Sequence, residues 1–161
     1  MINSRTDLER RVGDGVRRLA WLSDRIGQTF AARQDLHPTD FRALSFIYEA
    51  ERSGEPLTAS GLAAALNLGG PAVTYAVDRL VASGHVVRER DAADRRRVVL
   101  KHAPHGHEVA SEFFIPLGRR HHDALTDVSD ADLATFLGVL DAVADALAAH
   151  QADLTDGSRH E

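Results

Sequence analysis

The sequence predicts a mainly α-helical protein with one small β-hairpin, and three observations support this fold class. Apolar residues recur every three or four positions near both ends of the chain, which is the spacing of amphipathic helices. The middle of the chain holds two short helical patterns separated by Asn67-Leu68-Gly69-Gly70. Two runs rich in β-branched residues follow, on either side of a polar turn. The length suits one domain, which we place over residues 1–161.

The first predicted element is a long amphipathic helix over about 7–33, in which charged residues stand between the apolar ones. Pro38 interrupts the helical pattern, because a residue that precedes proline avoids helical geometry. Thr39 can then cap a second helix, which ends at Ser53-Gly54-Glu55-Pro56.

Two short helices are predicted next. Thr58 is placed to cap the first of them, and Pro71 lies in the first turn of the second, where proline is favoured. Two short helices joined by a tight turn that contains glycine form a helix-turn-helix. We expect Val73, Val77 and Leu80 of the second helix to face the core. The residues left on its exposed face are Ala72, Thr74, Tyr75, Asp78 and Arg79.

After Gly84 the apolar spacing changes, and Val86–Arg90 and Arg97–Leu100 predict a β-hairpin. The tip of the hairpin carries three consecutive arginines, Arg95, Arg96 and Arg97. In isolation such a run is typical of a solvated turn. Directly after a helix-turn-helix it indicates DNA contact instead, because a helix in the major groove places a neighbouring β-ribbon beside the minor groove. The winged helix-turn-helix region predicted in this way covers 39–101.

Helical spacing returns over about 104–150, where we expect Pro116 to kink or split the helix. The N- and C-terminal helices are longer than a winged helix needs as cover, so we expect them to be dimerisation helices that bind a second copy of the chain. Packing within one subunit is the alternative. The predicted interface residues are Val12, Val16, Leu19, Leu133, Phe136, Leu137, Leu140, Val143 and Leu147.

Charge is segregated along the chain, although the net charge is −5. The segment 79–101 holds seven basic and three acidic residues, whereas residues 123–161 hold nine acidic residues and one basic residue. A phosphate-facing segment in an otherwise acidic chain is expected of a protein that binds double-stranded DNA at specific sites.

The sequence also argues against several classes of protein. The absence of cysteine excludes disulfides and cysteine-ligated zinc. The sequence has no stretch that approaches the ~18 consecutive apolar residues of a membrane span, and no signal-peptide layout, so we expect a cytoplasmic protein with no membrane partner. No nucleophile constellation or phosphate-binding glycine loop is present, so we predict no enzyme activity and no cofactor.

The sequence resembles the multiple-antibiotic-resistance regulator (MarR) family over roughly residues 10–150. The matching stretches are Leu57-Thr58 with Leu62-Ala63, Val73-Thr74 with Val77-Asp78-Arg79-Leu80 and Gly84, and Arg90-Asp91 with Asp94-Arg95-Arg96 and Val99-Leu100. The most specific of these is the wing pattern at Asp94 and Arg96. The resemblance implies a homodimer that binds a palindromic operator, usually as a repressor that a small ligand releases.

The resemblance also implies roles for single residues. Arg96 would enter the minor groove, Asp94 would brace the wing by pairing with a neighbouring arginine, and Thr74 would contact the major groove. Gly69-Gly70-Pro71-Ala72 departs from the family, which often has a hydroxyl cap and a polar residue there, and Tyr75 stands where an arginine is frequent. The predicted DNA-binding residues are Thr58, Ser60, Pro71, Ala72, Thr74, Tyr75, Arg79, Asp94, Arg95, Arg96 and Arg97.

Two residues of the first helix form a candidate effector site. Trp21 and Arg25 lie four positions apart and share one helix face, where an indole beside a guanidinium suits a small, planar, anionic aromatic ligand. Some family members that respond to urate or similar purines resemble this chain in having a tryptophan and arginines there. The alternative is that Trp21 fills the dimer interface and Arg25 is solvated.

Two alternative functions stay open. Histidines cluster at His102, His105 and His107 and again at His121 and His122, and this clustering is the ground for the first alternative, a metal-responsive regulator. Our own prediction is that the chain has no metal site. The few polar residues on the second helix of the helix-turn-helix favour a protein-interaction module that does not bind DNA. The arginines of the wing argue against that module, because protein binding gives no reason to keep them.

Overall fold

The computed structural model describes residues 4–157, which divide after Pro116 into two compact units. Within this described range, the first unit holds four helices, a hairpin and the first part of a fifth helix, and the second unit holds the rest of the chain. The mainly helical chain with one antiparallel hairpin confirms the predicted fold class. That the whole chain forms one domain stays a prediction.

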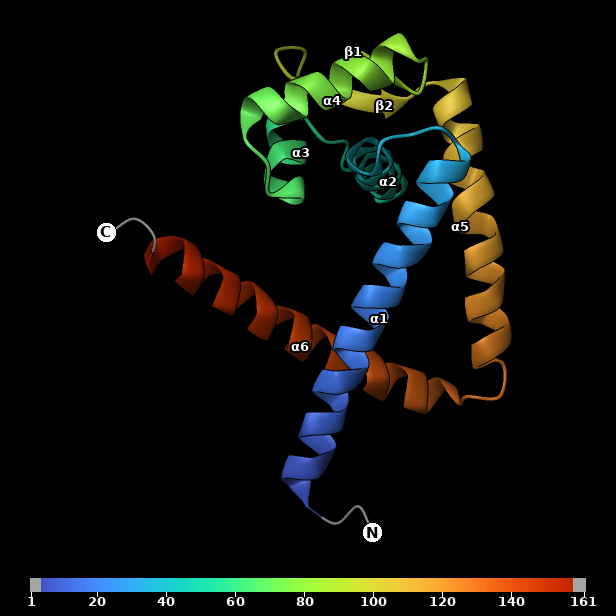
Figure 1. The fold of residues 1–161 in the computed structure, drawn as a ribbon, viewed down its shortest axis with the longest axis vertical. Helices are drawn as coiled ribbons and strands as arrows, with labels where there is room; N and C mark the ends of the chain where they lie inside the picture. The colour runs from blue at the N-terminus through green and yellow to red at the C-terminus, as the bar shows by residue number, and fades with distance from the viewer. Residues whose placement is uncertain (1–3, 158–161) are drawn as a thin grey trace. The chain divides into compact units, whose positions relative to one another are not determined.

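The first two helices are close to their predicted positions (Figure 1). α1 spans Arg5–Arg33 and α2 spans Pro38–Arg52. The cap of α2 is His37, whose ring Nδ1 accepts a hydrogen bond from the backbone N–H of Thr39 at 3.2 Å. The prediction that Thr39 is the cap is therefore wrong. Pro38 takes the first helical position instead, where its missing N–H costs no hydrogen bond.

α3 and α4 form the helix-turn-helix. α3, Ala59–Leu66, begins after Thr58, whose hydroxyl accepts a hydrogen bond from a backbone N–H at 3.1 Å, as predicted. The residue that follows the helix, Asn67, adopts the left-handed conformation with a φ of 52°, which is common at helix ends. α4, Gly70–Ala82, follows and has no side-chain cap at its N-terminus.

The wing is a two-stranded antiparallel sheet of β1, Val86–Arg90, and β2, Val98–His102. Residues 91–97 connect the strands. Gly84, between α4 and β1, has a φ of +73°, which a residue with a side chain rarely adopts. The structure thus confirms the predicted order of helix, turn, helix and hairpin.

The last two helices are α5, Pro104–Leu125, and α6, Asp130–Gly157. α5 is not split at Pro116. α6 begins after Ser129 and continues beyond its predicted end near residue 150. Among the described residues, α6 is the one helix that is long and apolar enough to cross a membrane, judged by length and composition only. The same composition is expected of a helix that packs against another protein surface.

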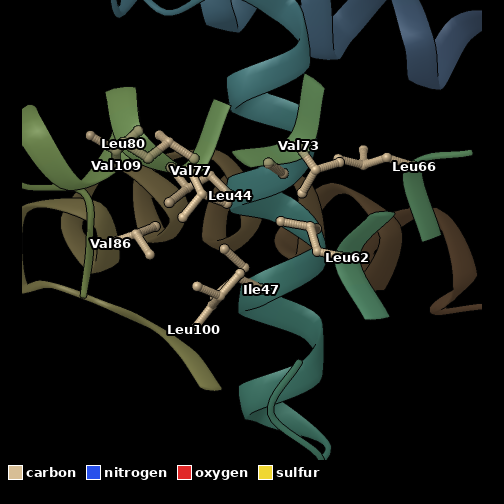
Figure 2. Close-up of a cluster of buried hydrophobic side chains, with 11 residues drawn as sticks. Leu44, Ile47, Leu62, Leu66, Val73, Val77, Leu80, Val86, Leu100 and Val109 are labelled. Atoms are coloured by element: carbon tan, nitrogen blue, oxygen red, sulfur yellow. The ribbon is translucent and has the colours of Figure 1, made fainter. Parts of the chain in front are cut away.

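The apolar core of the winged helix lies between α2, α3, α4, the hairpin and the start of α5 (Figure 2). Val73, Val77 and Leu80 of α4 are buried, as predicted, so α4 turns its opposite face to solvent. The core residues are Ala43, Leu44, Ile47, Leu62, Leu66, Val73, Val77, Leu80, Val86, Leu100 and Val109.

The first turn of α5 lies directly against the corner between α4 and β1. The backbone carbonyl of His85, at this corner, accepts a hydrogen bond from the N–H of Ala103 at 3.0 Å. A Cβ atom added to Gly106 would lie 1.9 Å from that carbonyl oxygen. Only glycine therefore allows α5 to approach the corner so closely.

Candidate nucleic-acid interface

The outward face of α4 carries the residues that the helical spacing predicts. Ala72, Thr74, Tyr75 and Asp78 are exposed, and Arg79 is half-buried. The side chain of Tyr75 is the largest of these, and 66% of the residue is accessible to solvent. α4 thus presents a mixed surface of small, hydroxyl and aromatic groups.

The helix that precedes α4 contributes hydroxyl groups. Thr58 and Ser60, at the start of α3, have their side-chain oxygens 2.9 Å apart. Pro71, in the first turn of α4, is exposed. Hydroxyls of this kind are common partners of DNA phosphates.

Arg79 is held by a carboxylate from another helix. Its Nε donates a hydrogen bond to Oδ2 of Asp40 at 2.8 Å, and its Nη2 donates to the other carboxylate oxygen. Asp40 lies in the first turn of α2 and is only 4% exposed. The hydrogen bond that Arg79 donates to Asp40 raises the pKa of Arg79, so the guanidinium stays charged. The guanidinium carbon lies 4.4 Å from the centre of the Tyr75 ring.

An ion pair connects α4 to the wing. Nη2 of Arg88, on β1, lies 2.6 Å from Oδ1 of Asp78, on α4. The pair neutralises a carboxylate on the exposed face of α4, where an unpaired negative charge would repel DNA phosphates.

The tip of the wing presents arginine side chains. Arg95, Arg96 and Arg97 are all exposed, and 94% of the Arg96 side chain is accessible to solvent. Oδ1 of Asp94 accepts a hydrogen bond from the backbone N–H of Arg96 at 3.0 Å and lies 3.4 Å from its Nε. Arg97 lies 3.3 Å from Asp91. Asp94 therefore makes the arginine pair that the family resemblance implies, while Arg96 stays accessible.

The clustered histidines make separate contacts. His102 pairs with the carboxylate of Glu51 through its ring Nδ1 and its backbone N–H. The rings of His85 and His105 lie 4.4 Å apart between centroids. Burial, followed by the neighbouring His105 ring, lowers the pKa of His85. Within residues 4–157, no three histidine, aspartate or glutamate side chains are grouped so that they could hold a metal ion.

Trp21 and Arg25 lie together on α1, as their spacing predicts. The guanidinium carbon of Arg25 is 4.7 Å from the centre of the Trp21 ring. Trp21 is 59% exposed, so the pair is accessible from solvent.

The predicted dimer-interface residues lie on α1 and α6, and in the described chain they are exposed or half-buried. Val12, Leu19, Phe136, Leu137 and Leu147 are exposed. Val16, Leu133, Leu140 and Val143 are half-buried. Each helix therefore keeps an apolar surface in contact with solvent.

Asp40 and Arg88 are two site residues that sequence reasoning misses. The position of Asp40, two residues after Pro38, suggests only a carboxylate near a helix start, and its partner Arg79 is 39 residues away. Arg88 belongs to a strand, and nothing in the local spacing indicates that it reaches α4. Both contacts depend on tertiary packing, which no sequence periodicity encodes.

Comparison with known proteins identifies the family. The sequence model of the MarR family matches residues 34–97 of this chain. The chain is 31% identical over 143 residues to the uncharacterized HTH-type transcriptional regulator YcgE of Bacillus subtilis (strain 168), with 89% of this chain and 90% of that protein covered.

Two solved structures of transcription regulators are similar to this chain in sequence and fold. The transcriptional regulator BldR from Sulfolobus solfataricus is 26% identical, with a TM-score of 0.58 and coverage of 89% of this chain and 99% of BldR. The reduced form of MarR from E. coli is 25% identical, with a TM-score of 0.54 and coverage of 81% and 94%. With a helix-turn-helix, an arginine-tipped wing and these relatives, the chain belongs to the MarR family of DNA-binding transcription regulators.

Proposed function

We propose that this regulator is a cytoplasmic homodimeric repressor that binds a palindromic operator and that a small ligand releases from DNA. The observation that carries the DNA-binding part is the exposed Arg96 at the tip of a wing that an ion pair connects to α4. In this arrangement α4 contacts the major groove and the wing reaches the adjacent minor groove. The DNA-contacting residues are those predicted on α3, α4 and the wing, except Arg79, whose guanidinium is engaged by Asp40.

The apolar surfaces of α1 and α6 support the homodimer. Leu137 of α6 is 58% exposed in the described chain. Exposed apolar side chains along one helix are typical of a surface that binds a partner. Two-fold symmetry of a dimer matches the symmetry of a palindromic operator. A solved S. aureus MepR variant, 17% identical with a TM-score of 0.51, is bound to an oligodeoxyribonucleotide.

Mutation of the wing tests DNA binding. Arg96→Ala is expected to weaken binding to DNA from around the regulator's own gene by about tenfold or more. It is also expected to reduce the slope of log affinity against log salt by about one, because the variant lacks one side-chain cation that neutralises DNA phosphates. Fluorescence anisotropy at several salt concentrations measures both quantities.

Arg52→Ala is the matched control, because Arg52 is an exposed arginine of α2 that pairs with a residue of its own helix. This variant should retain the affinity and the salt slope of the wild type. Salt-independent binding by the wild type, or equal effects of the two substitutions, would contradict the proposed role of the wing.

Trp21 and Arg25 support the proposed effector site, because an exposed indole with a guanidinium over its ring can bind a planar anionic ligand. MepR of S. aureus, 17% identical with a TM-score of 0.55, has been solved bound to ethidium bromide. A thermal-shift titration with urate and phenolic acids should raise the Tm of the wild type but not of Trp21→Ala. No shift with either class would refute the site.

A further inference from the structure

The largest exposed group on the outward face of α4 is the ring of Tyr75, and a guanidinium lies over this ring. Its neighbour one helical turn away, Arg79, places its guanidinium 4.4 Å from the ring centre. The guanidinium is fixed in turn by both carboxylate oxygens of Asp40, which is almost completely buried at the start of α2. Three side chains from two helices therefore form one continuous contact.

We propose that Tyr75 contacts a base in the major groove, and that Asp40 and Arg79 are positioning residues that hold its ring ready for this contact. The inference rests on the DNA-binding function proposed above. A tyrosine ring can pack against a thymine methyl group, and its hydroxyl can donate or accept a hydrogen bond at a base edge. A side chain that is ordered before binding loses less rotamer entropy on the DNA.

The same contacts remove Arg79 from the set of phosphate-binding residues. To reach a phosphate, the guanidinium would have to leave Asp40, and the buried carboxylate would then lose its partner. Leaving an uncompensated charge in the interior costs more than an exposed phosphate contact returns. Arg79 therefore contributes to specificity through Tyr75 and not to affinity through counterion release.

Binding to two DNA fragments tests the proposal, one holding the operator defined by footprinting and one of the same length with random sequence. Tyr75→Ala and Asp40→Asn should each lower the ratio of operator to random-sequence affinity by about fivefold or more. In the Tyr75→Ala background, Asp40→Asn should have no further effect on this ratio, because it acts through the ring. Arg79→Gln should lower the ratio without changing the salt slope.

Glu51→Gln is the matched control for Asp40→Asn, because Glu51 is also a carboxylate of α2 with a distant partner, His102. It should leave the affinity ratio unchanged. Two other variants test the inference if Asp40→Asn does not fold. Tyr75→Ala alters an exposed residue, and Arg79→Lys keeps the positive charge but loses the planar guanidinium. Arg79→Lys should also lower the ratio.

Two results would overturn the inference while leaving the proposed function intact. In the first, the wild type binds the operator with salt-dependent affinity, and Tyr75→Ala leaves the ratio of operator to random-sequence affinity unchanged. The other is a salt slope that falls by about one in Arg79→Gln, as expected of a phosphate contact. A wild type that binds no DNA would instead refute the proposed function itself.

Discussion

The polar side chains buried in the winged helix are all paired. Asp40 binds Arg79, His102 binds Glu51, and His85 lies 2.8 Å from the hydroxyl of Ser83. Within residues 4–157, no buried side-chain nitrogen or oxygen lacks a hydrogen-bond partner. A substitution that removes one member of a pair leaves the other desolvated, so these residues affect stability as well as position.

His85 makes stability depend on pH. Burial, followed by His105, lowers the pKa of His85 below its ordinary value of 6.5, so the unfolded chain binds the proton first as the pH falls. The stabilisation from neutral His85 is present above pH 6.5 and is lost as the pH falls through the lowered value. We therefore predict that the free energy of unfolding decreases on acidification from about pH 7.5 to about pH 5.5.

Urea unfolding of the wild type and of His85→Gln at both pH values measures the effect. The variant should lose less stability than the wild type, because its side chain does not titrate. The titratable groups around His85 are the same in both proteins. Asp40 favours the protonated ring of His85, whereas His105 and His102 oppose it. An equal loss in the two proteins would show that His85 is not responsible.

The elements of this fold were largely predictable because each one satisfies a local rule. Apolar spacing located α1, α3 and α4, and the change of spacing after Gly84 located the hairpin. Thr58 was recognisable as a cap from its type and place, whereas the ring of His37 as a cap was not. The contact between α4 and α2 through Asp40 could not be predicted, because single-sequence spacing shows which face is buried and not what it meets.

The approach of α5 to the α4–β1 corner gives a prediction for this element. Gly106→Ala is expected to destabilise the protein by about 3 kcal/mol or more, because the new methyl group would overlap the carbonyl oxygen of His85 and α5 would have to shift. Gly118→Ala, in the same helix, has open space around the added Cβ. It should stabilise the protein by up to about 1 kcal/mol through higher helix propensity.

Urea unfolding of both α5 variants separates these outcomes, and circular dichroism checks that the helix content is retained. Similar effects of the two substitutions would show that helix propensity, and not the close contact with His85, controls the response.

At the scale of the whole molecule, charge and apolar surface are segregated. The segment 79–101, which includes the wing, holds seven basic and three acidic residues, whereas residues 123–161, which include α6, hold nine acidic residues and one basic residue. An acidic segment next to DNA would be repelled, so this segregation favours contact of α6 with protein. This division of charge is visible in the sequence alone, because composition differs so strongly along the chain.

The dimer is tested by placing a charge in the predicted interface. The wild type should sediment at twice the chain mass at micromolar concentration, and Leu137→Glu should raise the dimer dissociation constant by about tenfold or more, since an unpaired buried charge is costly. Phe46→Glu changes an exposed apolar residue of α2 outside the predicted interface and should stay dimeric. A monomeric wild type, or a dimeric Leu137→Glu, would count against this interface.

The close contact at Gly106 has a consequence for how this regulator can evolve. Because no larger residue fits between α5 and the backbone of His85, divergent relatives that keep this corner should retain glycine at the equivalent position. Exposed positions such as Thr74 and Tyr75 carry no such restriction from packing. New operator sequences can therefore be acquired by exchanging residues on the outward face of α4 while the geometry that presents them is inherited unchanged.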